Sequence, residues 1–338
     1  NTTGAQNVGL GAYALQSNTT AAYNVGIGYN TLGATTTGQQ NVAIGGNALD
    51  ANTTGGDNTA VGQAALGAST TASNNTAVGT NALGNNTTGA QNTAVGLQAL
   101  LNNTTGGYNL ALGYIALQAN TTASNNMAIG PGALTANTTG ASNVGLGRNA
   151  LNANTTADNN TAVGHASLPV NTTGTQNTAV GVNALVLNTE GSYNVSLGNY
   201  AGQTITTGDG CVSLGYNANP SSATVDNEFT LGSTSITSLR CNDTSISALS
   251  DSRDKTNVID SPYGLDFINT VRPVQFLWDT RDGNGKDGST RIGFLAQELL
   301  AATDGNNAVL DLVMDNNEDR LEAKYGNLLP VAIQAIKE

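Results

Sequence analysis

The chain opens with NTTGAQNVGLGAYALQS at residues 1–17, and residues 18–34, NTTAAYNVGIGYNTLGA, repeat this stretch almost position by position. The 17-residue spacing continues without insertion to residue 221, which gives thirteen consecutive units. Position 11 of the unit is glycine in every copy, from Gly11 to Gly215, and position 7 is asparagine in twelve copies, from Asn7 to Asn194. Such regularity is typical of a solenoid, in which each unit stacks on its neighbours.

The segment from position 7 to position 11, for example NTAVG at Asn58–Gly62, alternates as a β-strand does. Position 10 is always Val, Ile or Leu, and position 8 is Val, Thr, Leu or Met, whereas position 9 is only Gly, Ala or Ser. Position 15 is Leu in the first eleven copies, and the following Asn-Thr-Thr is turn chemistry. The unit therefore predicts two short strands and two turns per coil.

Two arrangements of the coil fit this pattern. In the one we favour, the asparagines at position 7 form a ladder inside a thin roll, positions 9 and 11 face inward, and positions 8 and 10 face outward. The resulting apolar stripe is too large for a soluble monomer, so other subunits must cover it. In the alternative, the bulky row lies inside with Leu15 and its equivalents, and the asparagine lies in a turn.

The amino-acid composition differs between the repeats and the C-terminal hundred residues. The 42 glycines and 4% aromatic residues do not suit a thick globular core, and of eleven Lys and Arg residues only Arg148 precedes Arg240. A net charge of −12 argues against nucleic acid and against anionic membranes, and no segment has the length of a membrane span. No signal peptide is visible. Cys211 and Cys241 either pair or, as we favour, remain two buried thiols.

The residues of the repeats do not predict a glycosylation, ice-binding or metal-binding function. The Asn-Thr-Thr sequon recurs because a turn recurs, and adjacent threonines do not form an ice-binding face. Acidic residues are too scattered for a calcium-binding roll, and His165 stands at a variable position. We therefore expect no metal site and no cofactor.

The unit NTAVG followed by ALG or ALQ resembles the head repeats of trimeric autotransporter adhesins. That resemblance spans residues 1 to about 221 and implies left-handed parallel β-rolls packed as a trimer. At roughly 4.8 Å per stacked strand, such a shaft would be about 60 Å long.

The repeat decays after Gly215, and the sequence changes character at SDSRDKTNV, residues 250–258. Ser250, Asp251, Arg253, Lys255 and Asn257 resemble the motif that opens the intramolecular chaperone domain of endosialidase-type phage tail fibres and tailspikes. GLDFINTVRPVQFLWD, RIGFLAQEL and LPVAIQAIKE resemble later motifs of that family in the same order. The resemblance covers residues 250–338.

The resemblance implies that the domain is cut from the fibre at the Leu249–Ser250 bond. Ser250 would be the nucleophile and Lys255 the base, with Asp251 and Arg253 as helpers. A desolvated lysine can act as a base for a weakly nucleophilic hydroxyl. The alternative reading is that SDSRDK is a charged turn leading into the domain.

The C-terminal residues themselves predict a small α+β unit. Leu265–Val271 is an amphipathic segment that Pro273 ends, and Val274–Trp278 reads as a strand. A strand and a helix follow around Ile292–Leu300, and AVLDLVMD and DRLEAKY read as paired strands. Residues 328–336 have helical spacing, with Leu329, Ala332, Ile333 and Ile336 on one face.

Together these features predict a mainly β protein: a trimeric parallel β-roll or solenoid of 17-residue coils, followed by a small α+β chaperone domain. The expected boundaries are 1–221 for thirteen coils, 222–249 for a β-rich neck and 250–338 for the chaperone domain. The expected function is the structural shaft of a phage tail fibre or appendage, with a trimeric autotransporter-like adhesin as the alternative. The expected partners are two further copies, other virion or tail proteins and a host-surface receptor, with no nucleic acid and no membrane insertion. The shaft would assemble in the host cytoplasm and function extracellularly on the virion.

Overall fold

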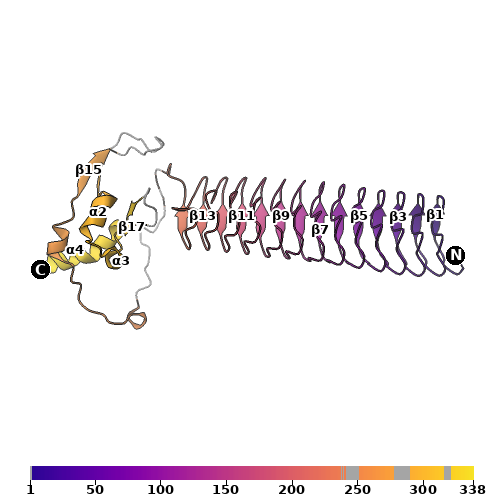
Figure 1. The fold of residues 1–338 in the computed structure, drawn as a ribbon, viewed down its shortest axis with the longest axis horizontal. Helices are drawn as coiled ribbons and strands as arrows, with labels where there is room; N and C mark the ends of the chain where they lie inside the picture. Colours follow the sequence, from indigo (N-terminus) through magenta and orange to yellow (C-terminus); the bar gives the residue numbers. More distant parts are fainter. Residues whose placement is uncertain (1, 237, 239, 241–250, 278–289, 316–320) are drawn as a thin grey trace. The chain divides into compact units, whose positions relative to one another are not determined.

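A computed structural model describes residues 2–236, 238, 240, 251–277, 290–315 and 321–338. The chain forms two compact units, Asn1–Ser233 and Thr234–Glu338, which are coloured from indigo to orange and from orange to yellow in Figure 1. We call the first unit the shaft and the second the C-terminal unit.

The shaft is a parallel β-solenoid with one three-residue strand per coil (Figure 1). Consecutive strands pair in the order of the sequence, and each residue lies beside its equivalent one repeat later, as Ala77 does beside Ala94. The strands are β1 Val8–Leu10, β2 Val25–Ile27, β3 Val42–Ile44, β4 Thr59–Val61, β5 Thr76–Val78, β6 Thr93–Val95, β7 Leu110–Leu112, β8 Met127–Ile129, β9 Val144–Leu146, β10 Thr161–Val163, β11 Thr178–Val180, β12 Val195–Leu197, β13 Val212–Leu214 and β14 Phe229–Leu231. The predicted solenoid of 17-residue coils is confirmed, and β14 adds a strand within the segment expected to be the neck.

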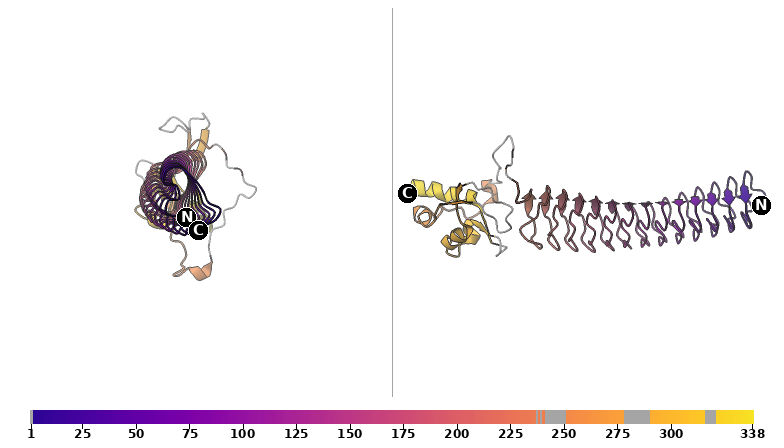
Figure 2. Two further views of the ribbon diagram at one scale, coloured as in Figure 1. Left: turned by 90° about the vertical axis from the view of Figure 1, so that its right-hand side faces the viewer. Right: turned by 90° about the horizontal axis from the view of Figure 1, so that it is seen from above.

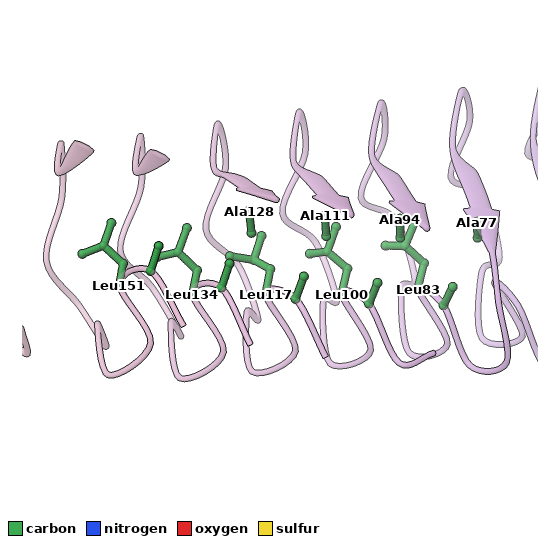
Figure 3. Close-up of a cluster of buried hydrophobic side chains, with 14 of the residues drawn as sticks. Ala77, Leu83, Ala94, Leu100, Ala111, Leu117, Ala128, Leu134 and Leu151 are labelled. Atoms are coloured by element: carbon green, nitrogen blue, oxygen red, sulfur yellow. The ribbon is translucent and has the colours of Figure 1, made fainter. Parts of the chain in front are cut away.

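The interior of the coil is thin. Position 9, for example Ala94, and the leucine at position 15, for example Leu83 and Leu100, are fully buried. Figure 3 shows these leucines and alanines as one row running along the inside of the coils. Positions 8 and 10 stay partly exposed on the outer side of the strands. The outward arrangement is therefore confirmed, although the leucine row lies inside as the alternative arrangement required.

The prediction of a second strand in each coil is wrong. Positions 12–17 form turns, and position 15 has a left-handed backbone, with φ of 51° at Leu83. Position 13 is also left-handed, with φ of 56° at Asn81. A leucine in this conformation is strained. The burial of its side chain in the coil interior offsets that strain, because no other large apolar group fills the space.

The asparagines at position 7 connect each coil to the next. The backbone N–H of Asn109 donates to Asn92 Oδ1 at 2.9 Å, and Asn126 N–H donates to Asn109 Oδ1 at 3.0 Å. The Nδ2 of Asn109 donates to the carbonyl of Ala123 at 2.9 Å. Each buried amide thus bridges coils through backbone groups that the short strands leave unpaired, and the predicted ladder is confirmed.

A second amide ladder occupies position 1 of the repeat. Asn120 Nδ2 donates to Asn103 Oδ1 at 2.8 Å and to the carbonyl of Ala123 at 3.0 Å. Both asparagines are fully buried, so the sequon asparagine is inaccessible to glycosylation in the folded coil. The sequence predicts this residue only as part of a turn, because its ladder partners lie one coil away.

The amide ladder ends before the last strand of the shaft. Cys211 replaces the asparagine in the thirteenth coil, and its thiol donates to the carbonyl of Val225 at 3.1 Å, in place of the amide. Cys211 is a free, buried cysteine, and burial raises the pKa of its thiol. In the next coil Glu228 accepts hydrogen bonds from the N–H and hydroxyl of Ser221 at 2.8 and 2.6 Å. Cys241 lies outside the described residues.

The C-terminal unit contains short helices and two two-stranded antiparallel sheets. Its elements are η1 Ser252–Asp254, α1 Leu265–Ile268, β15 Val274–Leu277, β16 Thr290–Gly293, α2 Ala296–Ala302, α3 Asn307–Leu310, β17 Val313–Met314, β18 Glu322–Ala323, η2 Tyr325–Asn327 and α4 Leu328–Lys337. Strand β15 pairs with β16, and β17 with β18. The core is formed by Leu299, Leu310, Leu312, Val313, Leu328 and Val331.

Most of the elements predicted for this unit are present. The amphipathic segment is helical only to Ile268, and the chain turns before Pro273. The paired strands around Val313 and Glu322 are confirmed, but Asn307–Leu310 is helical rather than extended. The Asn307 side chain explains this start: its Nδ2 donates to the carbonyl of Val313 at 2.9 Å and fixes the entry to β17.

Glycine at position 11 is required by the stacking of the coils. Gly79 has φ of +133°, and a Cβ there would lie 2.5 Å from the carbonyl oxygen of Gly96 in the next coil. We expect Gly79→Ala to destabilise the neighbouring coils by about 1–3 kcal/mol, because both the backbone strain and the contact oppose it. The measurement is hydrogen exchange of the amides in the adjacent coils. Gly46→Ala is the control, since nothing lies within 4 Å of its added Cβ; equal protection in both variants would contradict this account.

Candidate functional site

The predicted processing motif begins the described part of the C-terminal unit. Asp251 is the N-cap of η1, and its Oδ1 accepts a hydrogen bond from the backbone N–H of Arg253 at 2.9 Å. The Arg253 guanidinium also donates hydrogen bonds to the Asp251 carboxylate, from Nε to Oδ1 at 3.0 Å and from one terminal nitrogen to Oδ2 at 2.5 Å. The two predicted helpers therefore bind each other.

This ion pair is at the surface. The Arg253 side chain is 86% exposed and that of Asp251 is 42% exposed. The guanidinium holds the pKa of the Asp251 carboxyl below its ordinary value. An exposed pair contributes little to stability, so its effect is to fix the geometry of the turn.

The catalytic part of the prediction is only partly described by the structure. Lys255, the predicted base, is exposed in the single chain, and its backbone N–H donates to the carbonyl of Ser252 at 3.3 Å. Ser250, the predicted nucleophile, and the Leu249–Ser250 bond lie outside the described residues. The pairing of Ser250 with Lys255 stays a prediction.

The shaft presents a second candidate surface, which we call the shaft stripe: the side chains at positions 8 and 10 of the coils. They project from the outer side of the fourteen-stranded sheet, which runs along the shaft as a continuous ladder (Figure 2, right). Large apolar members of the stripe are exposed, among them Ile44 at 37%, Leu146 at 40% and Leu231 at 51%. A contiguous apolar surface of this kind marks a site of protein association.

Helix α4 also has an exposed apolar face. Leu328 and Val331 are buried in the core of the C-terminal unit, whereas Leu329, Ile333 and Ile336 are exposed by 63%, 46% and 84%. The exposed residues have the four-then-three spacing of a coiled-coil seam. These residues share the helical face that their spacing predicts, and this face lies outside the core of its own unit.

The described residues include no group of three or more His, Cys, Asp and Glu side chains that could hold a metal ion. In the same part of the chain, no helix is both long enough and apolar enough to span a membrane. The candidate surfaces are therefore the exposed motif at residues 251–255, the shaft stripe and the outer face of α4.

Comparison with known proteins gives one finding. Residues 250–310 match the family described as chaperone of endosialidase. The match begins at Ser250 and supports the chaperone domain that the sequence motifs predict. Neither the curated proteins nor the solved structures gave a match.

The pairing of Asp251 with Arg253 has a measurable consequence. The folded pKa of Asp251 is depressed, so the pairing is present above the ordinary carboxyl pKa and is lost as the pH falls through the depressed value. We expect Arg253→Gln to raise the pKa of Asp251 toward 3.8, its ordinary value, because the charged partner is removed. Carboxyl NMR titration measures this shift. Arg240→Gln should leave the titration unchanged, and an unchanged titration in Arg253→Gln would contradict the pairing.

Proposed function

We propose that this protein is the trimeric shaft of a fibre, with a C-terminal chaperone domain that aligns three chains and guides their folding. The observation on which this rests is the shaft stripe. Its apolar side chains stay exposed although they lie beside a fully formed sheet. A single chain cannot cover them, because the leucine and alanine rows already fill its interior.

Further copies of the same chain suit this surface best. The stripe repeats at one strand spacing along fourteen strands, and a partner that covers all of it needs the same spacing. A parallel copy has that spacing by construction, and a rotation about one axis extends the arrangement to a closed ring of three. The exposed face of α4 supplies a second self-association surface in the C-terminal unit.

The chaperone match supports a role for this assembly in a fibre. A chaperone-of-endosialidase domain together with a solenoid shaft fits a fibre, and we assign the fibre to a phage tail or a related appendage. The protein would then reside in the virion and contact other virion or tail proteins and a host-surface receptor. The low charge of the shaft and its amide-rich turns are compatible with an extracellular structural role.

Deletion of residues 250–338 before or after assembly distinguishes the chaperone role of this segment from the structural role of the shaft. We expect a gene product ending at Leu249 to give aggregated or mis-registered chains, since near-identical coils align in several ways. Removal of residues 250–338 from the assembled fibre should leave a trimer that persists kinetically. Native mass spectrometry measures the copy number in each case. Uniform trimers from the truncated gene would refute the chaperone role, and a monomeric full-length chain would refute the trimer.

We further propose that the fibre processes itself before Ser250. The Ser250 hydroxyl oxygen would attack the Leu249 carbonyl carbon while Lys255 takes the hydroxyl proton and returns it to the departing Ser250 nitrogen. Water would then hydrolyse the ester, leaving a Leu249 carboxylate and a Ser250 amine. The exposed Lys255 of the single chain would have to lose water contact, and assembly with other chains is the step that would bury it.

Intact mass tests this chemistry. We expect Ser250→Ala and Lys255→Ala each to abolish cleavage without preventing trimer formation, because each removes one reacting group. Arg240→Ala is a matched control that removes a neighbouring positive charge. If the two variants are cut as fast as the wild type, residues 250–255 form only a charged turn.

A further inference from the structure

The tyrosines of the shaft are not scattered evenly among its coils. Residues 1–221 contain eight tyrosines, and six of these lie in the second, seventh and twelfth coils, which are five coils apart. They are Tyr23 and Tyr29, Tyr108 and Tyr114, and Tyr193 and Tyr200. In the repeat, Tyr23, Tyr108 and Tyr193 all occupy position 6, while Tyr29 and Tyr114 occupy position 12.

Position 6 is an unfavourable place for a tyrosine. The backbone is left-handed there, with φ of 62°, 59° and 61° at Tyr23, Tyr108 and Tyr193. Some other coils carry residues that adopt this conformation readily, such as Asn74 and Gly210, whereas glutamines such as Gln6 and Gln91 share the unfavourable backbone. The three tyrosine side chains are 56%, 63% and 61% exposed, so burial within the chain does not offset the cost. What distinguishes Tyr23, Tyr108 and Tyr193 at this position is therefore a large aromatic side chain that the single chain leaves exposed.

The tyrosines border the shaft stripe. Positions 7 and 9 are buried, whereas positions 6, 8, 10 and 12 of the second and seventh coils are exposed or partly exposed. Positions 6 and 12 therefore form the two edges of the stripe. The second coil presents Tyr23, Val25, Ile27 and Tyr29 in this order, and the seventh presents Tyr108, Leu110, Leu112 and Tyr114. Both edges are aromatic only in these two coils.

A ring of three parallel copies brings opposite edges together. In cyclic symmetry one surface of each copy meets a different surface of the next, and all copies lie at the same height. Position 6 of one copy then faces position 12 of its neighbour within the same coil. This reasoning rests on the proposed trimer.

We propose that the second and seventh coils are register marks for association of the chain with further copies of itself. Tyr23 and Tyr108 of one copy pack against Tyr29 and Tyr114 of the next copy. A shift of one to four coils sets these tyrosines against the smaller or polar residues of other coils and loses the aromatic contacts. A shift of five coils, about 24 Å, restores one aromatic pair in one direction and two in the other, but it leaves five coils uncovered at each end. Shifts of a few coils are therefore unfavourable because the Tyr23–Tyr29 and Tyr108–Tyr114 contacts are lost, and larger shifts are unfavourable because the terminal coils are left uncovered.

Oxidative coupling of tyrosines tests the contact in the full-length protein. Irradiation with a ruthenium photo-oxidant should give covalent dimers and trimers on denaturing gels, with peptide mapping to Tyr23–Tyr29 and Tyr108–Tyr114 links. Tyr23–Tyr29 and Tyr108–Tyr114 links that are found in the covalent dimer and trimer bands, and not in the monomer band, join two chains. Tyr13 and Tyr29 pack edge to face at 5.6 Å within one chain, and their coupling checks the reaction without producing covalent dimers.

Matched variants then separate the register marks from the general stripe. Tyr23→Asn with Tyr108→Asn should lose the interchain links, and after refolding the terminal coils should show a second, faster-exchanging population by hydrogen exchange. Gln6→Asn with Gln91→Asn alters the same position, with the same spacing and the same introduced residue, and should retain both the links and uniform exchange.

The outcomes distinguish this inference from the proposed function. A trimer by native mass that lacks these links, or a tyrosine variant that behaves like the glutamine variant, overturns the register marks and leaves the trimer intact. A tyrosine variant that keeps uniform register also overturns the inference, because the tyrosines would then not set the alignment of the chains. A monomer by native mass overturns the proposed trimer.

Discussion

The shaft depends on hydrogen bonds that pass from each coil to the next. Strands of three residues pair only part of the backbone, and turn residues add further coil-to-coil bonds, such as that from the Leu100 N–H to the Ala116 carbonyl at 3.0 Å. Buried backbone groups that remain without partners are costly. The amides of Asn92, Asn109 and Asn126 supply the missing partners, each accepting from the following coil and donating to its turn. Glycine at position 11 allows the carbonyl groups of adjacent coils to approach closely enough for this stacking.

The same arrangement limits what the interior can hold. One leucine and one small residue fill each coil, so the larger side chains at positions 8 and 10 face outward. A chain built in this way has its apolar surface on both sides of one sheet, as parallel sheets usually do. In most proteins helices cover the second side, and here the repeat contains no helix to do so.

The near-identity of the coils makes the alignment of associating chains ambiguous. Because every coil offers nearly the same contacts, two chains can associate in several registers of similar free energy. Specific assembly then needs features that the repeat does not supply. The chain has two kinds: a non-repeating C-terminal unit with an exposed apolar helix face, and tyrosines that recur every fifth coil rather than in each one. Both break the equivalence of the coils without disturbing the stacking inside them.

The sequence by itself determined the solenoid and its period, and it favoured the inward amide ladder and the outward stripe over an alternative arrangement that only the structure excluded. Thirteen copies of one environment show which positions are constrained, and strand alternation converts those positions into two faces. The motifs after Ser250 were sufficient to place the chaperone domain that the family match supports. These features are local or repeat at short range, and so they can be read along the chain.

Only the tertiary structure decided the features that depend on neighbouring coils or on packing. Leu83 and its equivalents look like strand residues, and their left-handed backbone follows from the space they fill in the coil interior. The asparagine at position 1 forms its ladder only once the coils are stacked. Strand β14 was hidden because Glu228 replaces the usual asparagine, and Asp251 pairs with Arg253 through a turn that the sequence does not specify. In α4, spacing predicted an apolar face, but which face is buried depends on the core around Val331.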